Sequence, residues 1–154
     1  MNEELKKQIR VIDQRIKELY ALYHSAANYI GISDGEFTIW SVLLSTEQDY
    51  SQQELCDLLS LPRQTMNSII SKLVRIGFVY LEHIPGTRNQ KTIHLTPQGV
   101  EFGRNEVMWV LKAEERALEQ ADPQQIQVSI DLIETFAQHF KQELAHPQKS
   151  DTEM

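Results

Sequence analysis

Residues 51–73 read SQQELCDLLSLPRQTMNSIISKL, and they contain two short amphipathic runs joined by a link that includes Pro62. Ser51 and Glu54 have the spacing of a capping box, which predicts the start of a short helix. Pro62 suits the first position of a second helix. Two such helices joined by a tight turn form a helix-turn-helix, and the second helix is narrow enough to enter a DNA major groove. The expected inward side chains of the first helix are Leu55, Leu58 and Leu59.

The second helix of this pair separates into an apolar and a polar side. Its predicted buried residues recur at helical spacing and are Met66, Ile69, Ile70, Leu73 and Ile76. The polar side has hydrogen-bonding and cationic types without a carboxylate, namely Arg63, Gln64, Asn67, Ser68, Ser71 and Lys72. Arg pairs with guanine, and Asn or Gln with adenine, through paired hydrogen bonds. A carboxylate at this place would face phosphates and repel them, so its absence favours contact with DNA.

The distribution of charge separates this region from the rest of the chain. The 154 residues have a formal charge of -7, but residues 51–96 hold five Lys and Arg against three Asp and Glu, a net charge of +2. An acidic protein is a poor indiscriminate nucleic-acid binder, whereas a central segment of opposite sign leaves local contact open. An ordinary fluctuation of composition would explain the same numbers.

After Gly77 the hydrophobic period changes from 3.6 to 2. Residues 79–84 and 92–95 alternate, and the turn-rich loop PGTRNQ at residues 85–90 lies between them, which predicts a two-stranded hairpin. Such a hairpin must pack on the helices to be stable. Arg88 and Lys91 are expected near its tip, where a long cation could enter a minor groove. The order helix-turn-helix then hairpin predicts a mainly α fold with a small β-wing, a winged helix-turn-helix.

Long amphipathic helices are expected on both sides of this domain. The spacing predicts helices over about residues 4–29, 34–45, 97–120 and 123–146, with capping boxes at Ser33 and Asp122 and an N-cap at Thr96. The outer helices have more apolar surface than a small domain needs. We therefore predict a helical dimerisation region over residues 1–30 and 97–146 that flanks a DNA-binding domain over residues 31–96. Residues 147–154 are expected to form a disordered tail.

The order and composition of these segments resemble the MarR (multiple antibiotic resistance regulator) family of winged-helix transcription factors. The resemblance covers nearly the whole chain and is closest over residues 51–79, at Arg88 and in HLTPQG at residues 94–99. It implies a homodimer that binds a pseudo-palindromic operator in double-stranded DNA, with repression the expected outcome. The dimer interface is expected to come from the first, fifth and sixth helices, which are the long helix before the DNA-binding domain and the two long helices after it. The DNA-binding residues predicted on both grounds are Ser51, Gln52, Arg63, Gln64, Thr65, Asn67, Ser68, Ser71, Lys72, Arg88, Asn89, Gln90 and Lys91.

Two positions depart from the family pattern. The family's wing usually has an Asp two residues before the Arg, where this chain has Gly86, so an Asp–Arg pair at the wing tip is in doubt and the wing of the free protein is expected to be more mobile. The turn of the helix-turn-helix often has Gly where this chain has Ser60. A small polar residue is tolerable there, at some loss of backbone freedom.

The sequence contains candidate residues for three kinds of sensing. Release by a small-molecule effector would need a pocket with aromatic walls and a few polar groups, for which the candidates, each also explained by core packing, are Tyr20, His24, Trp40, Met108 and Trp109. Cys56 lies among leucines in a short helix and is expected to be an unreactive thiol. His139, Glu143 and His146 lie on one helical face and could bind a metal, although a solvated polar face is the simpler interpretation and no metal or cofactor is predicted.

Other classes of protein find little support in the sequence. We expect no enzyme, because zinc-protease, nucleophile-elbow, phosphate-loop and Cys-x-x-Cys motifs are absent. No apolar run has the length of a membrane span, the first ten residues do not have the pattern of a secretory signal, and the single cysteine suits the cytoplasm. The alternative hypothesis is a winged-helix protein-interaction module without DNA binding. Acidic or exposed apolar residues on the recognition face would favour it.

Overall fold

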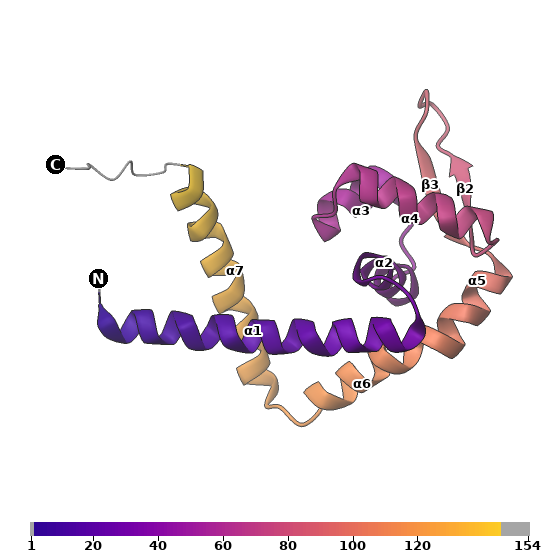
Figure 1. Cartoon of the computed structure of the whole chain (residues 1–154). Helices are drawn as coiled ribbons and strands as arrows, with labels where there is room; N and C mark the ends of the chain where they lie inside the picture. The colour runs from indigo at the N-terminus through magenta and orange to yellow at the C-terminus, as the bar shows by residue number, and fades with distance from the viewer. Residues whose placement is uncertain (1, 146–154) are drawn as a thin grey trace. The chain divides into compact units, whose positions relative to one another are not determined.

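A computed structural model of the chain describes residues 2–145. The chain divides into two compact units, residues 1–112 and 113–154. Figure 1 shows the elements in order. They are α1 (Glu3–Ile30), α2 (Asp34–Ser45), β1 (Tyr50–Ser51), α3 (Gln52–Leu59), α4 (Arg63–Arg75), β2 (Val79–His83), β3 (Lys91–Leu95), α5 (Pro97–Phe102), the π-helix η1 (Gly103–Val107), α6 (Met108–Leu118) and α7 (Pro123–Ala145).

The winged helix-turn-helix fold predicted from the sequence is confirmed. β2 and β3 pair antiparallel, with Leu81 opposite Ile93, and the hairpin directly follows α4. The prediction missed β1, which adds a third strand in the order β1-β3-β2. A strand of two residues has too few positions to show a period of two, so the alternation that identifies longer strands is not visible there.

The helix expected over residues 97–120 is continuous but irregular. Thr96 caps it as predicted, since its Oγ1 accepts a hydrogen bond from the Gly99 amide at 3.0 Å. Gly99 is required here, because a Cβ at this position would lie 2.0 Å from the carbonyl oxygen of Phe78. The helix then widens into the π-turn η1 before α6 begins. The sequence pattern had indicated one uniform α-helix.

One hydrophobic core lies within the first unit, where α2 packs between α1 and the α3–α4 pair (Figure 1). Trp40 is fully buried and its ring contacts those of Phe78 and Phe102. Two residues expected to face inward do not: Leu58 is 55% exposed and Ile76 is 39% exposed. Cys56 is buried in place of Leu58, so α3 is rotated relative to the predicted face.

The apolar stripes of the outer helices are exposed within the single chain. In α1 the residues Leu5, Ile9, Ile12, Ile16 and Leu19 are all exposed, and no residue of α7 is buried. No helix among the described residues combines the length and apolarity that crossing a membrane requires. The tail predicted over residues 147–154 lies outside the described residues.

Candidate nucleic-acid interface

The start of α3 is fixed by a complete capping box. Oγ of Ser51 accepts from the Glu54 amide at 3.2 Å, and the Glu54 carboxylate accepts from the Ser51 amide at 2.7 Å. Hydrogen bonds from the backbone and then the side chain of Ser51 hold the pKa of Glu54 below its usual range. The box therefore fixes the amino end of the helix that supports the recognition helix.

The turn between α3 and α4 has an unusual backbone conformation at Ser60. Its φ of 52° lies in the left-handed region, which is the region that glycine adopts without cost. The Leu61 amide donates to the Cys56 carbonyl at 3.2 Å and closes the helix end. Pro62 then precedes α4 as its N-cap residue rather than its first helical residue. The sequence departure at Ser60 thus sits where the backbone requires a positive φ.

The two sides of α4 lie as the spacing predicted. Met66, Ile69, Ile70 and Leu73 are buried, while the exposed predicted residues are Arg63, Gln64, Thr65, Asn67, Ser68 and Ser71. No carboxylate belongs to α4. The polar side of this helix is therefore open for contact with another molecule.

Lys72 differs from the other polar residues of α4. Its Nζ lies 2.6 Å from Oε2 of Glu36, whose side chain is only 4% exposed. The predicted capping box at Ser33 is correspondingly half formed: Ser33 accepts from the Glu36 amide at 3.1 Å, but the Glu36 carboxylate pairs with Lys72. A buried carboxylate needs a cation, so Lys72 joins α4 to α2 and its charge is largely neutralised.

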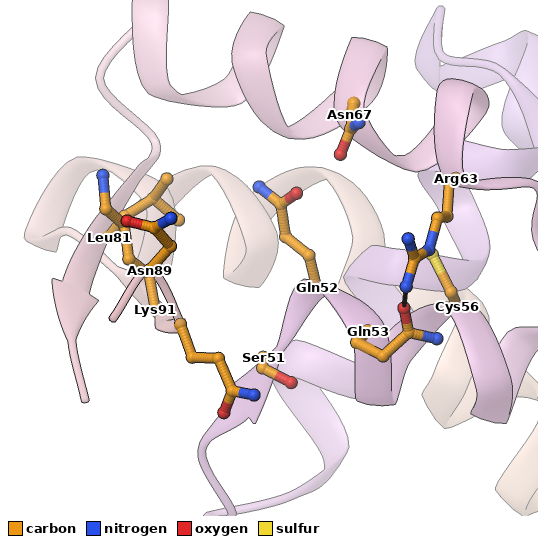
Figure 2. A pocket seen from close by; sticks show the side chains of 10 residues that line it. Ser51, Gln52, Gln53, Cys56, Arg63, Asn67, Leu81, Asn89 and Lys91 are labelled. Carbon is orange, nitrogen blue, oxygen red and sulfur yellow. Dashed lines mark hydrogen bonds between the residues drawn. The ribbon is translucent and has the colours of Figure 1, made fainter. Parts of the chain in front are cut away.

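A groove of about 400 Å³ lies between α3, α4 and the wing, and Figure 2 shows the side chains around it. It brings together seven of the predicted DNA-binding residues, namely Ser51, Gln52, Arg63, Asn67, Asn89, Gln90 and Lys91. Asn67 and Gln52 direct their amides into the same space from α4 and α3 (Figure 2). We call this hollow the wing-side groove.

A second hollow lies on the other side of α4, against the start of α2. Ser68, Ser71 and Lys72 line it together with Glu36 and Arg75. Gln64, Thr65 and Arg88 line neither hollow and are exposed. The structure therefore places the predicted residues along both flanks of one helix and on the adjoining wing.

The wing tip closes without an acidic residue. The Thr87 amide donates to the Ile84 carbonyl at 3.2 Å, and Oγ1 of Thr87 donates to the same oxygen at 2.7 Å. Pro85 and Gly86, the latter with a φ of 79°, occupy the central positions of this turn, which is the pattern of a type II turn. A glycine is thus needed at the place where the family usually has Asp.

The free positive charge of this surface comes from few side chains. Within residues 2–145, Arg75, Arg88 and Lys91 are exposed and form no salt bridge. Arg63 bonds a neutral amide, that of Gln53. These four cations remain available for phosphates, whereas Lys72 is already paired.

Sequence reasoning missed Gln53, which lines the wing-side groove and bonds both Arg63 and Asp57. Gln53 and Asp57 are four residues apart, a spacing at which Gln and Asp side chains meet on a helix surface. That spacing could have identified the pair. The bond to Arg63 crosses the turn and has no local signal.

The five side chains predicted for an effector pocket have different surroundings within the single chain. Trp40 is in the core and Tyr20 is 70% exposed on α1. His24 pairs with Asp34, its Nδ1 2.9 Å from Oδ1. Trp109 contacts the Tyr29 ring edge-on, and Met108 is half-buried at the start of α6. None of the five lines either hollow beside α4, and the effector pocket stays a prediction.

The other sensing candidates are the thiol of Cys56 and the possible metal ligands of the last helix. Cys56 is a free, buried cysteine, and its low reactivity stays a prediction. Among the described residues no three His, Cys, Asp or Glu side chains cluster as metal ligands. His146 lies outside those residues, so the line of His139, Glu143 and His146 is not described as a whole.

A helix-turn-helix with an exposed polar recognition face and an adjoining cationic hairpin defines the chain as a winged helix-turn-helix protein. More narrowly, it has the fold of the MarR family of transcriptional regulators. A MarR family regulator from Neisseria meningitidis superposes with a TM-score of 0.78 at 14% identity, covering 94% of this chain and 98% of the other.

Two further solved structures share this fold. A Streptomyces coelicolor MarR family regulator in complex with DNA has a TM-score of 0.74 at 16% identity and covers 100% of this chain and 96% of its own. Staphylococcus aureus MarR in complex with salicylate and kanamycin has a TM-score of 0.66 at 17% identity, with 92% and 95% covered. No sequence-family description matches the chain, and no curated protein is similar to it in sequence.

Proposed function

We propose that this protein is a sequence-specific transcriptional regulator of the cytoplasm that binds a pseudo-palindromic operator as a homodimer and represses transcription. The observation that carries the proposal is the exposed side of α4, which has hydrogen-bonding residues and no carboxylate and adjoins the unpaired cations of the wing. In this arrangement α4 enters the major groove and Arg88 reaches the neighbouring backbone or minor groove. The DNA complex of the Streptomyces coelicolor neighbour supports such a use of the fold.

Dimerisation is proposed from the outer helices. α1 and α7 leave their large apolar residues exposed, among them Leu19 at 56% and Ile133 at 67%. Contiguous apolar stripes of this length are uncommon on a monomer, and a second copy would bury them. Residues 1–30 and 97–146 are accordingly the proposed dimerisation region, and residues 31–96 the proposed DNA-binding domain.

A small-molecule effector belongs to the proposal on one ground only. The Staphylococcus aureus neighbour was solved with salicylate and kanamycin, so a protein of this fold admits small molecules. The proposal assigns the small molecule to no particular residues of this chain.

Selection of bound duplexes from a random DNA pool tests the proposal with the full-length protein. We expect recovery of one sequence with two related half-sites whose centres are about 10–11 base pairs apart or a multiple of that spacing. Failure to enrich any sequence, or enrichment of a single half-site by a monomer, would contradict the proposal. The alternative, a protein-interaction module without DNA binding, predicts no enrichment, so enrichment of any sequence would exclude it.

A further inference from the structure

Arg63 opens α4 with a guanidinium that α3 holds in place. Its Nη2 donates a hydrogen bond to Oε1 of Gln53, and Nε2 of Gln53 donates to Oδ1 of Asp57 at 2.9 Å. Figure 2 shows Arg63 and Gln53 joined at the wall of the wing-side groove. All three side chains are exposed, and Arg63 and Gln53 line the wing-side groove on the surface proposed to face DNA.

The hydrogen bonds of Arg63, Gln53 and Asp57 all run in one direction, from the guanidinium donor to the carboxylate acceptor. A carboxylate only accepts, so Asp57 takes the NH₂ end of the Gln53 amide and leaves its oxygen toward Arg63. A guanidinium only donates and has five N–H groups, so the bond to Gln53 leaves others for a guanine edge or a phosphate. Because Gln53 is neutral, it orients the cation without cancelling its charge, unlike Glu36 beside Lys72.

We infer that Gln53, oriented by Asp57, is a positioning residue that presets Arg63 for contact with the operator. The inference rests on the proposed function and names a residue through which α3 contributes to sequence preference without touching a base. Loss of the preset conformation should lower the preference for operator over scrambled DNA by roughly 2- to 10-fold, the size expected for ordering one long side chain on binding.

The first test needs no DNA. The NMR order parameter of the Arg63 Nε–H bond is measured in the full-length protein and in Gln53→Met, which keeps the side-chain length but not the hydrogen bonds. We expect the order parameter to fall in Gln53→Met and to stay unchanged in the matched control Gln52→Met on the same helix. Equal order in the wild type and Gln53→Met overturns the inference, whatever the protein binds.

The second test is a double-mutant cycle on the duplex recovered from the random pool, with a scrambled duplex as reference. Gln53→Met should lower the preference in the wild-type background and cause no further loss in Arg63→Ala, because its effect passes through Arg63. A further loss in that background shows that Gln53 contacts DNA itself and overturns the positioning role. Thermal unfolding of both variants checks that the fold is intact.

The two ideas fail in different ways. If no duplex is recovered while the order parameter still falls in Gln53→Met, the proposed function fails and the operator preference inferred from it falls too. If Arg63→Ala weakens the preference and Gln53→Met does not, the proposed function stands and the positioning role is overturned.

Discussion

Two amphipathic helices of this chain use their apolar sides differently. α4 buries Met66, Ile69, Ile70 and Leu73 within the first unit and leaves a polar side exposed. α7 buries no residue, and its exposed apolar residues include Phe136 and Phe140. A periodic apolar stripe therefore identifies a surface to be covered but not the molecule that covers it. For α4 the cover is the chain itself, and for α7 we propose a second copy.

The proposal that a second copy covers the apolar side of α7 is tested by placing a charge on that side. The rings of Phe136 and Phe140 stack with their centroids 5.5 Å apart. Phe136→Glu would bury an unpaired carboxylate in the proposed dimer, so we expect self-association to weaken at least about 100-fold, near 3 kcal/mol. Sedimentation equilibrium measures this, and DNA binding should fall with it.

Gln138→Glu is the matched control for that experiment. It adds the same charge to the same helix on the side opposite Phe136, and we expect little change in self-association. Equal association constants for both variants and the wild type would show that the apolar side of α7 is not the dimer surface.

The polar side of α4 is tested at Asn67, which points into the wing-side groove (Figure 2). If its amide reads a base, Asn67→Ala should relax the preference for that base by roughly 1–3 kcal/mol. Competition binding with operator variants measures the loss. Asn105→Ala makes the same change on the π-turn and should have no effect. Equal weakening on operator and scrambled DNA would show that Asn67 only positions the protein.

Lys72 is the polar residue of α4 whose side chain pairs with a buried carboxylate, that of Glu36. Lys72→Met keeps the stem of the side chain but leaves the buried Glu36 carboxylate without its cation. Because Lys72 is itself 42% exposed, we expect a loss of unfolding free energy of roughly 1–3 kcal/mol, below the range for fully buried pairs. Urea denaturation measures it, with the unpaired Lys91→Met as control. An unchanged stability would return Lys72 to the set of free DNA contacts.

The wing adds the unpaired cations Arg88 and Lys91 to those of α4. Arg88→Ala removes one unpaired cation per subunit, so the slope of log affinity against log salt should fall by about one unit for each subunit. Arg10→Ala on α1 removes the same charge far along the sequence from the recognition helix and should leave the slope unchanged. A slope that Arg88→Ala does not alter would exclude a wing contact with phosphate.

Local patterns made the helix-turn-helix predictable. These patterns are the capping box at Ser51, the apolar spacing of α4 and the change of period after Gly77. Each involves residues that are close together in the sequence. Each depends on hydrogen bonds or faces that a short segment forms by itself. The structure confirms the fold for that reason.

Features that depend on distant contacts were not predictable. Glu36 and Lys72 meet across 36 positions, so neither a capping-box pattern nor a polar helix face could show that they pair. Burial depends on distant contacts in the same way: Trp40 and Tyr20 are aromatic residues of neighbouring helices, but the packing buries one and exposes the other. Residue type suggests a pocket wall, and only tertiary packing decides it.

The smallest expected effect concerns the backbone that leads into α4. Among residues 2–145, Ser60 is the one non-glycine residue with a positive φ. A left-handed conformation costs a residue with a Cβ about 1–2 kcal/mol, and glycine loses about 0.5–1 kcal/mol of this gain through its freedom in the unfolded chain. Ser60→Gly should therefore raise the unfolding free energy by a few tenths to about 1 kcal/mol, with operator affinity unchanged.

Ser60→Ala separates this explanation from a simple change of side chain. Alanine keeps the Cβ and with it the strain of the left-handed conformation, so its stability should not rise. Both variants are compared with the wild type by urea denaturation. A Ser60→Gly protein less stable than the wild type would show that the serine side chain contributes more to this turn than its backbone strain costs. The recognition helix would then be held by its turn as well as by its buried face, whereas α7 buries no residue within the chain.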